Sequence, residues 1–220
     1  MSESSTLDAI ERSQTHLLVV EDEPTIRALF AALLSSAGFS VAQAEDGFTA
    51  LEEVRRRRPA LILSDLNMPR MTGFELLSVV RRRFPAIHVI AMSGAFAGDS
   101  IPAGVAADAF YEKSGRHIST LVQIIEELLI QAKALAAAGA PDPDPAVALW
   151  VTRRSTPAAD DGCYILLNCP ECLRSFPHCI GDEPTMRLAE TTCVFCKSVI
   201  SYALLDPSIT HHPGYAPKLP

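Results

Sequence analysis

Several features are scarce in this sequence, and each scarcity removes a class of protein. None of the six cysteines precedes residue 163, and Trp150 is the single tryptophan. No apolar run approaches the roughly 20 residues that a membrane-spanning helix needs, so membrane insertion is not expected. The N-terminal stretch MSESSTLDAIERSQTH has no apolar core. That composition argues against an export signal and predicts a cytoplasmic protein with reduced thiols.

Basic residues are also in deficit. The chain carries 19 Lys and Arg against 26 Asp and Glu, and acidic residues outnumber basic ones both before and after residue 140. A surface built mainly to hold a nucleic-acid backbone would show the opposite balance. Two arginine runs, Arg55–Arg58 and Arg81–Arg83, close predicted helices. Cations are favoured there and stay solvated, so neither run is assigned a binding role.

Between residues 16 and 138, short runs rich in Val, Ile and Leu alternate with segments of helical periodicity. The runs HLLVV, FSVAQAE, ALILSDL, HVIAMSG and DAFYEK predict five strands. The segments after them predict five helices. The fourth is expected to be short or broken, because AFAGDSIPAGVAAD contains Pro102 and two glycines. Strict alternation of this kind predicts a parallel sheet with helices on both faces.

Polar groups suited to phosphoryl transfer stand at the carboxyl ends of four of these strands, where open parallel sheets bind ligands. Carboxylates can hold Mg²⁺, and one carboxylate can attack phosphorus. An ammonium and a hydroxyl can stabilise the group in transfer. Each residue alone is more often structural, but their order at successive strand ends indicates a phosphoryl-transfer site. The groups are Glu21, Asp22, Asp65, Ser93 and Lys113.

The segments LLVVEDEP, LILSDLNMPRMTGFELL, VIAMSG and DAFYEKS resemble the receiver domain of two-component response regulators. The resemblance implies a flavodoxin-like (βα)5 doubly wound parallel sheet over residues 15–138. It implies that Asp65 accepts a phosphoryl group from a histidine kinase or phosphotransfer protein. The chain is then not an enzyme, with slow autodephosphorylation left open. Mg²⁺ would be held by Asp22 directly, by Glu21 through water, by Asp65, and by the backbone carbonyl of Asn67.

The same resemblance assigns the remaining site residues. Ser93 would hydrogen-bond the phosphoryl group, Lys113 would pair with it, and Phe110 would be the switch aromatic. Thr72 stands where the family often has an acid or Asn, and Ser114 replaces the usual proline after the lysine, so the cis peptide of that loop is in doubt. The weak fourth helix belongs to the family's usual dimerisation and signalling surface. A different signalling surface is therefore left open.

Four of the six cysteines have the spacing of a zinc site. Cys169-x2-Cys172 and Cys193-x2-Cys196 are separated by twenty residues, as in four-cysteine Zn²⁺ sites. A domain of about 45 residues has too small a core to be stable alone, and bound metal would supply folding energy. With the β-prone runs YILLN and SVISYAL beside it, residues 163–206 resemble a zinc ribbon. The alternative is a redox pair at the first CxxC.

Two cysteines fall outside this set. Cys163 and Cys179 are each expected to fill a small buried apolar position. Because His178 stands beside Cys179, replacement of a knuckle ligand by this pair is left open.

The remaining segments are predicted to connect or extend the two domains. The Asp-Pro repeat in AAAGAPDPDPA predicts a linker over residues 139–162. Within it, Trp150 and nearby aliphatic residues could dock on a neighbouring surface. Residues 1–14 are expected to be a disordered tail, and residues 207–220 a flexible one.

Together these features predict a phosphorylation-dependent response regulator whose ribbon is an output or docking module. Four thiolates around one Zn²⁺ leave a net charge of about −2, and the surrounding segment is acidic, so contact with an unknown protein target is favoured over nucleic acid. One alternative is a transcription regulator that uses the ribbon to bind DNA. Another is a metal or redox sensor in which the receiver is a scaffold.

Overall fold

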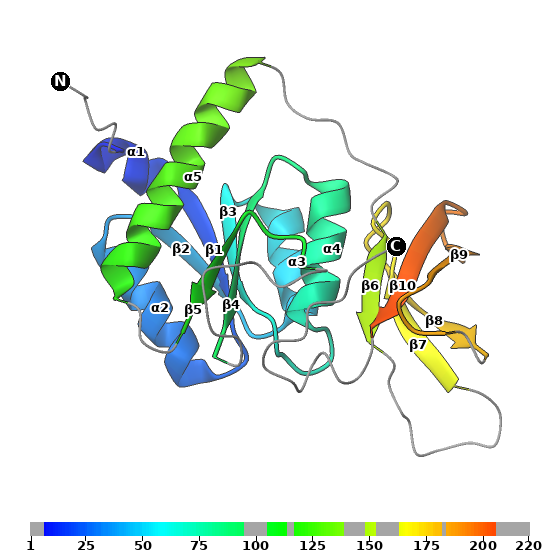
Figure 1. The fold of residues 1–220 in the computed structure, drawn as a ribbon. Helices are drawn as coiled ribbons and strands as arrows, with labels where there is room; N and C mark the ends of the chain where they lie inside the picture. Colours follow the sequence, from blue (N-terminus) through cyan, green and yellow to red (C-terminus); the bar gives the residue numbers. More distant parts are fainter. Residues whose placement is uncertain are drawn as a thin grey trace.

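The computed structural model describes residues 7–94, 105–113, 117–138, 148–152, 163–181 and 184–205. The weak fourth helix was predicted within 95–108. Residues 95–104 of that segment lie outside the described residues, as does Ser114. The described chain forms an α/β unit followed by a smaller β-rich module (Figure 1).

The α/β unit contains a five-stranded parallel sheet in the order β2-β1-β3-β4-β5. The alternating pattern predicted a parallel sheet with helices on both faces, and the family resemblance implied this doubly wound, flavodoxin-like arrangement; both are confirmed. Its strands are β1 (His16–Val20), β2 (Ser40–Ala44), β3 (Leu61–Asp65), β4 (His88–Ser93) and β5 (Ala109–Glu112). Its helices are α1 (Ala9–Gln14), α2 (Pro24–Ser36), α3 (Gly47–Arg56), α4 (Gly73–Arg83) and α5 (Ile118–Ala138).

Successive strand residues point to opposite faces of the sheet and so build two separate cores. On β1, Leu17 and Val19 belong to the core with α2 and α5, whereas Leu18 and Val20 belong to the core with α3 and α4. Because both faces are covered, the inner strands β1, β3 and β4 are almost entirely buried and mostly apolar, as is typical of parallel sheets. Figure 1 shows α1, α2 and α5 on one side of the sheet and α3 and α4 on the other.

Capping residues set where the helices near the carboxyl edge begin. The side chain of Asp46 accepts a hydrogen bond from Thr49 N at the start of α3. Thr72 and Glu75 form a reciprocal capping box at the start of α4. Thr72 therefore has a local structural role in place of the acid or Asn that it replaces.

The N-terminal segment is more ordered than its composition suggested. The sequence predicted a disordered tail through residue 14, whereas Ala9–Gln14 form α1 and Leu7 is buried. Arg12 pairs with Glu126 of α5, and Lys133 of α5 pairs with Glu11 at 2.7 Å. Contacts with a distant helix thus hold a segment that is too short to be helical by itself.

The β-rich module contains two small sheets. The antiparallel pair β7 (Cys163–Asn168) and β8 (Ser175–Ile180) forms one. The other has the order β6-β10-β9, from β6 (Leu149–Thr152), β9 (Leu188–Thr192) and β10 (Val199–Leu205). Strand β6 lies inside the predicted 139–162 linker and pairs in parallel with β10. Trp150 is thereby built into the module and buried.

Candidate functional site

Three carboxylates converge at the carboxyl edge of the parallel sheet. Glu21 and Asp22 follow β1, and Asp65 ends the neighbouring strand β3. One ligand oxygen from each lies within 4.8 Å of the other two. Glu21 and Asp65 are buried, and Asp22 is exposed. Asp22 is therefore the one acid of the three that faces solvent.

The ammonium of Lys113 completes this cluster from the end of β5. Its Nζ lies 2.6 Å from Glu21 Oε2 and 3.0 Å from Asp65 Oδ2. Its backbone N–H donates to the carbonyl oxygen of Ser93 at 3.0 Å. Ser93 is fully buried at the end of β4, so the fourth and fifth strands both reach the site.

Burial governs the protonation of this cluster. It raises the pKa of Asp65 and of Glu21, although the nearby Lys113 lowers both values in part. Burial also lowers the pKa of Lys113, but pairing with Asp65 and Glu21 outweighs it, so that pKa is raised overall. Two buried acids, Glu21 and Asp65, thus share one ammonium, and an added cation would stabilise their ionised forms.

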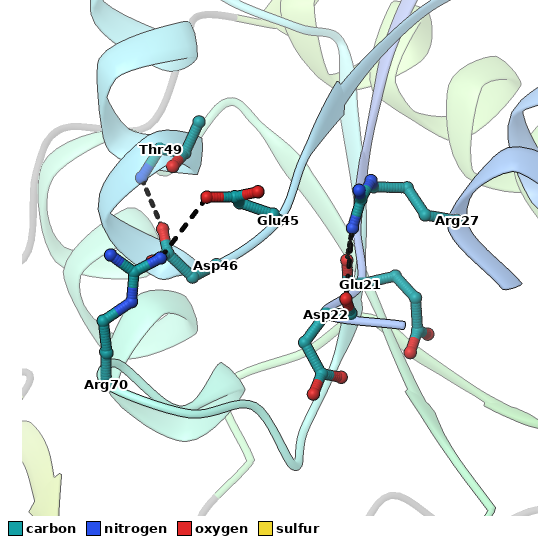
Figure 2. A network of polar contacts seen from close by, with 7 residues as sticks. All are labelled: Glu21, Asp22, Arg27, Glu45, Asp46, Thr49 and Arg70. Atoms are coloured by element: carbon teal, nitrogen blue, oxygen red, sulfur yellow. Dashed lines mark hydrogen bonds and ion pairs between the residues drawn. The ribbon is translucent and has the colours of Figure 1, made fainter. Parts of the chain in front are cut away.

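Two arginines hold the loops around the acids (Figure 2). Arg27 of α2 donates to the carbonyl oxygens of Glu21 and Asp22, at 2.6 Å and 3.3 Å. Arg70 pairs with Asp46, the residue that caps α3, and lies 3.5 Å from Glu45. The backbone of Arg70 has a φ of 66°, in the left-handed region that few non-glycine residues adopt.

The other predicted residues take different places. Asn67 is the second residue after β3, and its backbone N–H helps to lower the pKa of Asp65 against the larger effect of burial. Phe110 is buried in the core shared with α3 and α4, away from the carboxylates. Its neighbour Tyr111 lies on the opposite face, edge-on to Phe30 at 6.1 Å between ring centroids.

The donor set at the sheet edge fits Mg²⁺. Hard divalent cations prefer carboxylate and carbonyl oxygens and retain waters, and an exposed Asp22 leaves room for those waters. Glu21, Asp22 and Asp65 would hold the ion, and Asn67, whose carbonyl is the further predicted ligand, lies two residues after Asp65.

The second cluster unites the four predicted zinc cysteines. The Sγ atoms of Cys169, Cys172, Cys193 and Cys196 lie within 4.8 Å of one another. Cys169 and Cys196 are 3.6 Å apart, and Cys172 and Cys193 are 3.7 Å apart. A tetrahedron with Zn–S bonds of about 2.3 Å has S···S edges of about 3.8 Å. The spacing of the sulfurs therefore fits one Zn²⁺.

Matching turns present these sulfurs. Leu173 N donates to Cys169 O at 2.8 Å, and Lys197 N donates to Cys193 O at 3.0 Å. Leu173 and Lys197, each following the second cysteine of its pair, have φ values of 55° and 64°. The first turn joins β7 to β8, and the second joins β9 to β10. Two equivalent knuckles thus face each other.

The thiols in this cluster differ in their proton affinity. Hydrogen bonds from Ser198 lower the pKa of Cys196 to about 6. Burial raises the pKa of Cys172 to about 12. A bound cation would deprotonate all four, so metal binding would release protons.

One cysteine expectation was wrong. Cys179 is exposed on β8 rather than buried, because its strand is covered on one face only. His178 beside it hydrogen-bonds Tyr202 at 3.1 Å and contacts Thr191 at 3.3 Å, so its ring joins three strands. Neither belongs to the sulfur cluster. The side chain of Cys163 lies outside the described residues.

Sequence reasoning also missed two of the arginines. Arg82 is 4% exposed and donates to a backbone carbonyl of β10. Arg81 pairs with Asp108 at 2.8 Å. The run Arg81–Arg83 closes a helix, but only contacts with distant parts of the chain reveal that Arg82 is buried and that Arg81 is paired.

The α/β unit is similar to proteins of known family. The family model of the response regulator receiver domain matches residues 17–111. The nitrogen assimilation regulatory protein NtrX of Azorhizobium caulinodans is 41% identical over 80 residues, which are 36% of this chain and 18% of that protein. The transcriptional regulatory protein GlrR of Escherichia coli is 38% identical over 92 residues, which are 42% of this chain and 20% of that protein.

Among solved structures, NtrX from Brucella abortus in complex with ATP superposes with a TM-score of 0.50 and 29% identity. The match covers 56% of this chain and 28% of that one. The α/β part of the chain is therefore a response regulator receiver domain. The chain spans about a fifth of the length of the two curated relatives named above. Within the described residues, no helix is both long and apolar enough to cross a bilayer.

Proposed function

We propose that this chain is a phosphorylation-dependent response regulator that accepts a phosphoryl group on Asp65 from a histidine kinase or phosphotransfer protein. The observation that carries the proposal is the bridge formed by Lys113 between Glu21 and Asp65, with Asp22 beside it. A cation paired with an acceptor carboxylate, with further acids beside that carboxylate, is the arrangement that phosphoryl transfer needs.

The roles of the residues follow from their positions. A carboxylate oxygen of Asp65 attacks phosphorus, a new O–P bond forms, and the N–P bond of the donor phosphohistidine breaks. Lys113 stays close enough to pair with the phosphoryl oxygens, and the hydroxyl of Ser93 hydrogen-bonds one of them. Mg²⁺ at the three acids would offset the charge of the transferring group. Phe110 responds by repacking in the core beside α4.

For the second module, we propose a structural Zn²⁺ bound by the four clustered cysteines and a role in contacting protein. Val194 and Phe195 lie between the cysteines of the second knuckle and are exposed, as is Val199 beyond it. Exposed apolar side chains around a metal knuckle favour a protein partner. The acidic balance of the chain weighs against DNA, the other candidate partner.

The phosphoryl proposal is tested by treating the full chain with acetyl phosphate and Mg²⁺ and measuring its intact mass. Wild type should gain one phosphoryl group, and Asp65→Asn should gain none. An unmodified wild type, under conditions that label a known receiver domain, rejects the proposal.

The zinc proposal is tested by metal analysis of the purified chain. One Zn²⁺ per chain is expected for wild type and for Cys179→Ser, which leaves the cluster intact. Cys196→Ser should lose it. Substoichiometric zinc together with disulfides would instead support a redox pair. A mobility-shift assay with and without acetyl phosphate, over a range of salt concentrations, tests the alternative that the module binds DNA.

A further inference from the structure

The β-rich module is packed against helix α4 of the receiver domain. Arg82 of α4 donates from Nη2 to the backbone oxygen of Val199 at 3.1 Å. The hydroxyl of Ser78, also on α4, accepts from the backbone N–H of Trp150 at 3.2 Å. Ser78, Arg82 and Trp150 are all buried. The hydroxyl of Ser78 thus satisfies an edge N–H of β6, which Figure 1 shows beside α4.

A second contact joins the module to the segment that leads into α4. Met71 is fully buried, and its Sδ lies 3.7 Å from Asn168 Nδ2. Asn168 immediately precedes the zinc-site residue Cys169. On its other side, Met71 packs closely on Gly47, where an added Cβ would lie 2.6 Å from Met71 Cγ. Met71 therefore fills the space between α3 and the first knuckle.

The same segment is in tight contact with the acceptor residue. A Cβ added at Gly73, the first residue of α4, would lie 2.1 Å from the backbone oxygen of Asp65. The N–H of Gly73 also donates to Leu66 O at 3.0 Å. Residues 66–73 thus run from the acceptor, past Met71, to the helix that carries the module. Leu66, Met68 and Met71 on this route belong to one continuous cluster of buried residues, which also contains Trp150.

We propose that occupancy of the Asp65 site and docking of the β-rich module on α4 are energetically coupled through residues 66–73. The coupling rests on the proposed phosphoryl function. Close-packed interiors shift between discrete arrangements and do not deform freely. A phosphoryl group added to Asp65 displaces the backbone of Asp65, which is in contact with Gly73. Helix α4 and Met71 must therefore shift together. The module contacts both.

Trp150 reports on this docking directly, because it is the only tryptophan in the chain and lies at the interface. The test follows its emission in the full chain with Mg²⁺ alone and with Mg²⁺ plus beryllofluoride, a phosphoryl mimic. Wild type should show a change in emission on addition of beryllofluoride. Asp65→Asn should show none. An equal change in both would overturn the proposal, because the signal would not come from the acceptor.

Coupling is reciprocal, so weakening the interface must alter binding at the acceptor. Ser78→Ala and Arg82→Gln each remove one contact, and the affinity for beryllofluoride should differ from wild type by about fivefold or more. Ser36→Ala is the matched control for the first. The hydroxyls of Ser78 and Ser36 each donate to the carbonyl three residues earlier in their helix, but Ser36 is exposed on α2. Arg55→Gln, at an exposed position on α3, is the control for the second. Circular dichroism checks that each variant is folded.

The outcomes separate this proposal from the phosphoryl function. If acetyl phosphate modifies Asp65 while Trp150 emission stays constant and both interface variants bind beryllofluoride as wild type does, coupling is refuted and the phosphoryl function stands. If wild type takes up no phosphoryl group, both proposals fail. A change in emission with altered affinity in the two variants, absent from both controls, supports coupling.

Discussion

Arg81, near the end of α4, is paired with Asp108, the residue that precedes β5. Arg81 Nη2 lies 2.8 Å from Asp108 Oδ1. The other oxygen, Oδ2, accepts from the backbone N–H of Val89 at 2.8 Å and lies 3.5 Å from the ring of His88. One carboxylate thus joins α4, β4 and β5 on the side where the β-rich module docks.

Asp108 should make the stability of the receiver domain depend on pH. Although burial opposes ionisation, the nearby ring of His88 and hydrogen bonds from Arg81 and Val89 lower its pKa from 3.8 to about 2. A depressed pKa stabilises the fold above pH 3.8, and the stabilisation is lost as pH falls through about 2. The shift corresponds to about 2 kcal/mol. Urea unfolding of Asp108→Asn should show that loss at pH 7 and a smaller one at pH 3. The exposed Glu52→Gln serves as control, and equal losses at both pH values would contradict the assignment.

Gly73→Ala should disturb the acceptor site itself. An added methyl group would collide with the backbone of Asp65 and Leu66, which cannot rotate away as a side chain could. We expect a loss of about 2 kcal/mol or more in unfolding free energy, together with slower labelling by acetyl phosphate. Gly181→Ala is the control, because a Cβ there meets nothing within 4 Å. Similar losses in both variants would indicate a general cost of replacing glycine.

Lys113→Met should separate the charge of the lysine from its bulk. Without the ammonium, Glu21 and Asp65 remain as buried acids whose pKa values burial already raises. Because the acids then resist ionisation, the variant should lose stability as pH rises from 5 to 8, and its labelling by acetyl phosphate should fall at least tenfold. Lys133→Met is the control, because it removes a cation that is exposed. Unfolding curves and labelling rates at several pH values measure both effects. If Lys113→Met were labelled at the wild-type rate, Lys113 would have no role in the mechanism.

Removal of zinc should unfold the β-rich module and leave the receiver domain folded. Metal binding provides folding energy to small domains, and a cluster without its cation has little else to hold two knuckles together. A strong chelator should shift the emission of Trp150 to longer wavelength, while acetyl phosphate still modifies Asp65. Cys196→Ser should behave as the chelated protein does, and Cys179→Ser as wild type. An unchanged emission after complete metal removal would refute the structural role.

Much of the receiver fold was predictable from local patterns. The alternation of apolar strands and amphipathic helices specified a parallel sheet, and the carboxyl ends of parallel strands lie at one edge. Glu21, Asp65 and Lys113 could therefore be placed together before any coordinates were known. The two CxxC pairs were equally informative, because their spacing suits one tetrahedral ion.

Other features depended on contacts between distant residues. Helix α1 is held by α5, and Cys179 is exposed because its strand is covered on one face only. Neither fact is visible in the neighbouring residues. The same is true of Arg82, whose position at a helix end indicated a solvated charge.

The sequence by itself determined which side chains meet in the two candidate clusters, because periodicity and motif spacing act over short stretches of chain. Tertiary structure alone decided that the modules meet on α4. The contacts that join them link residues 72 positions apart at Ser78 and Trp150, and 117 apart at Arg82 and Val199. No local pattern encodes such pairs. In each, a polar side chain of α4 meets a backbone group of the module: Ser78 accepts from β6, and Arg82 donates to β10.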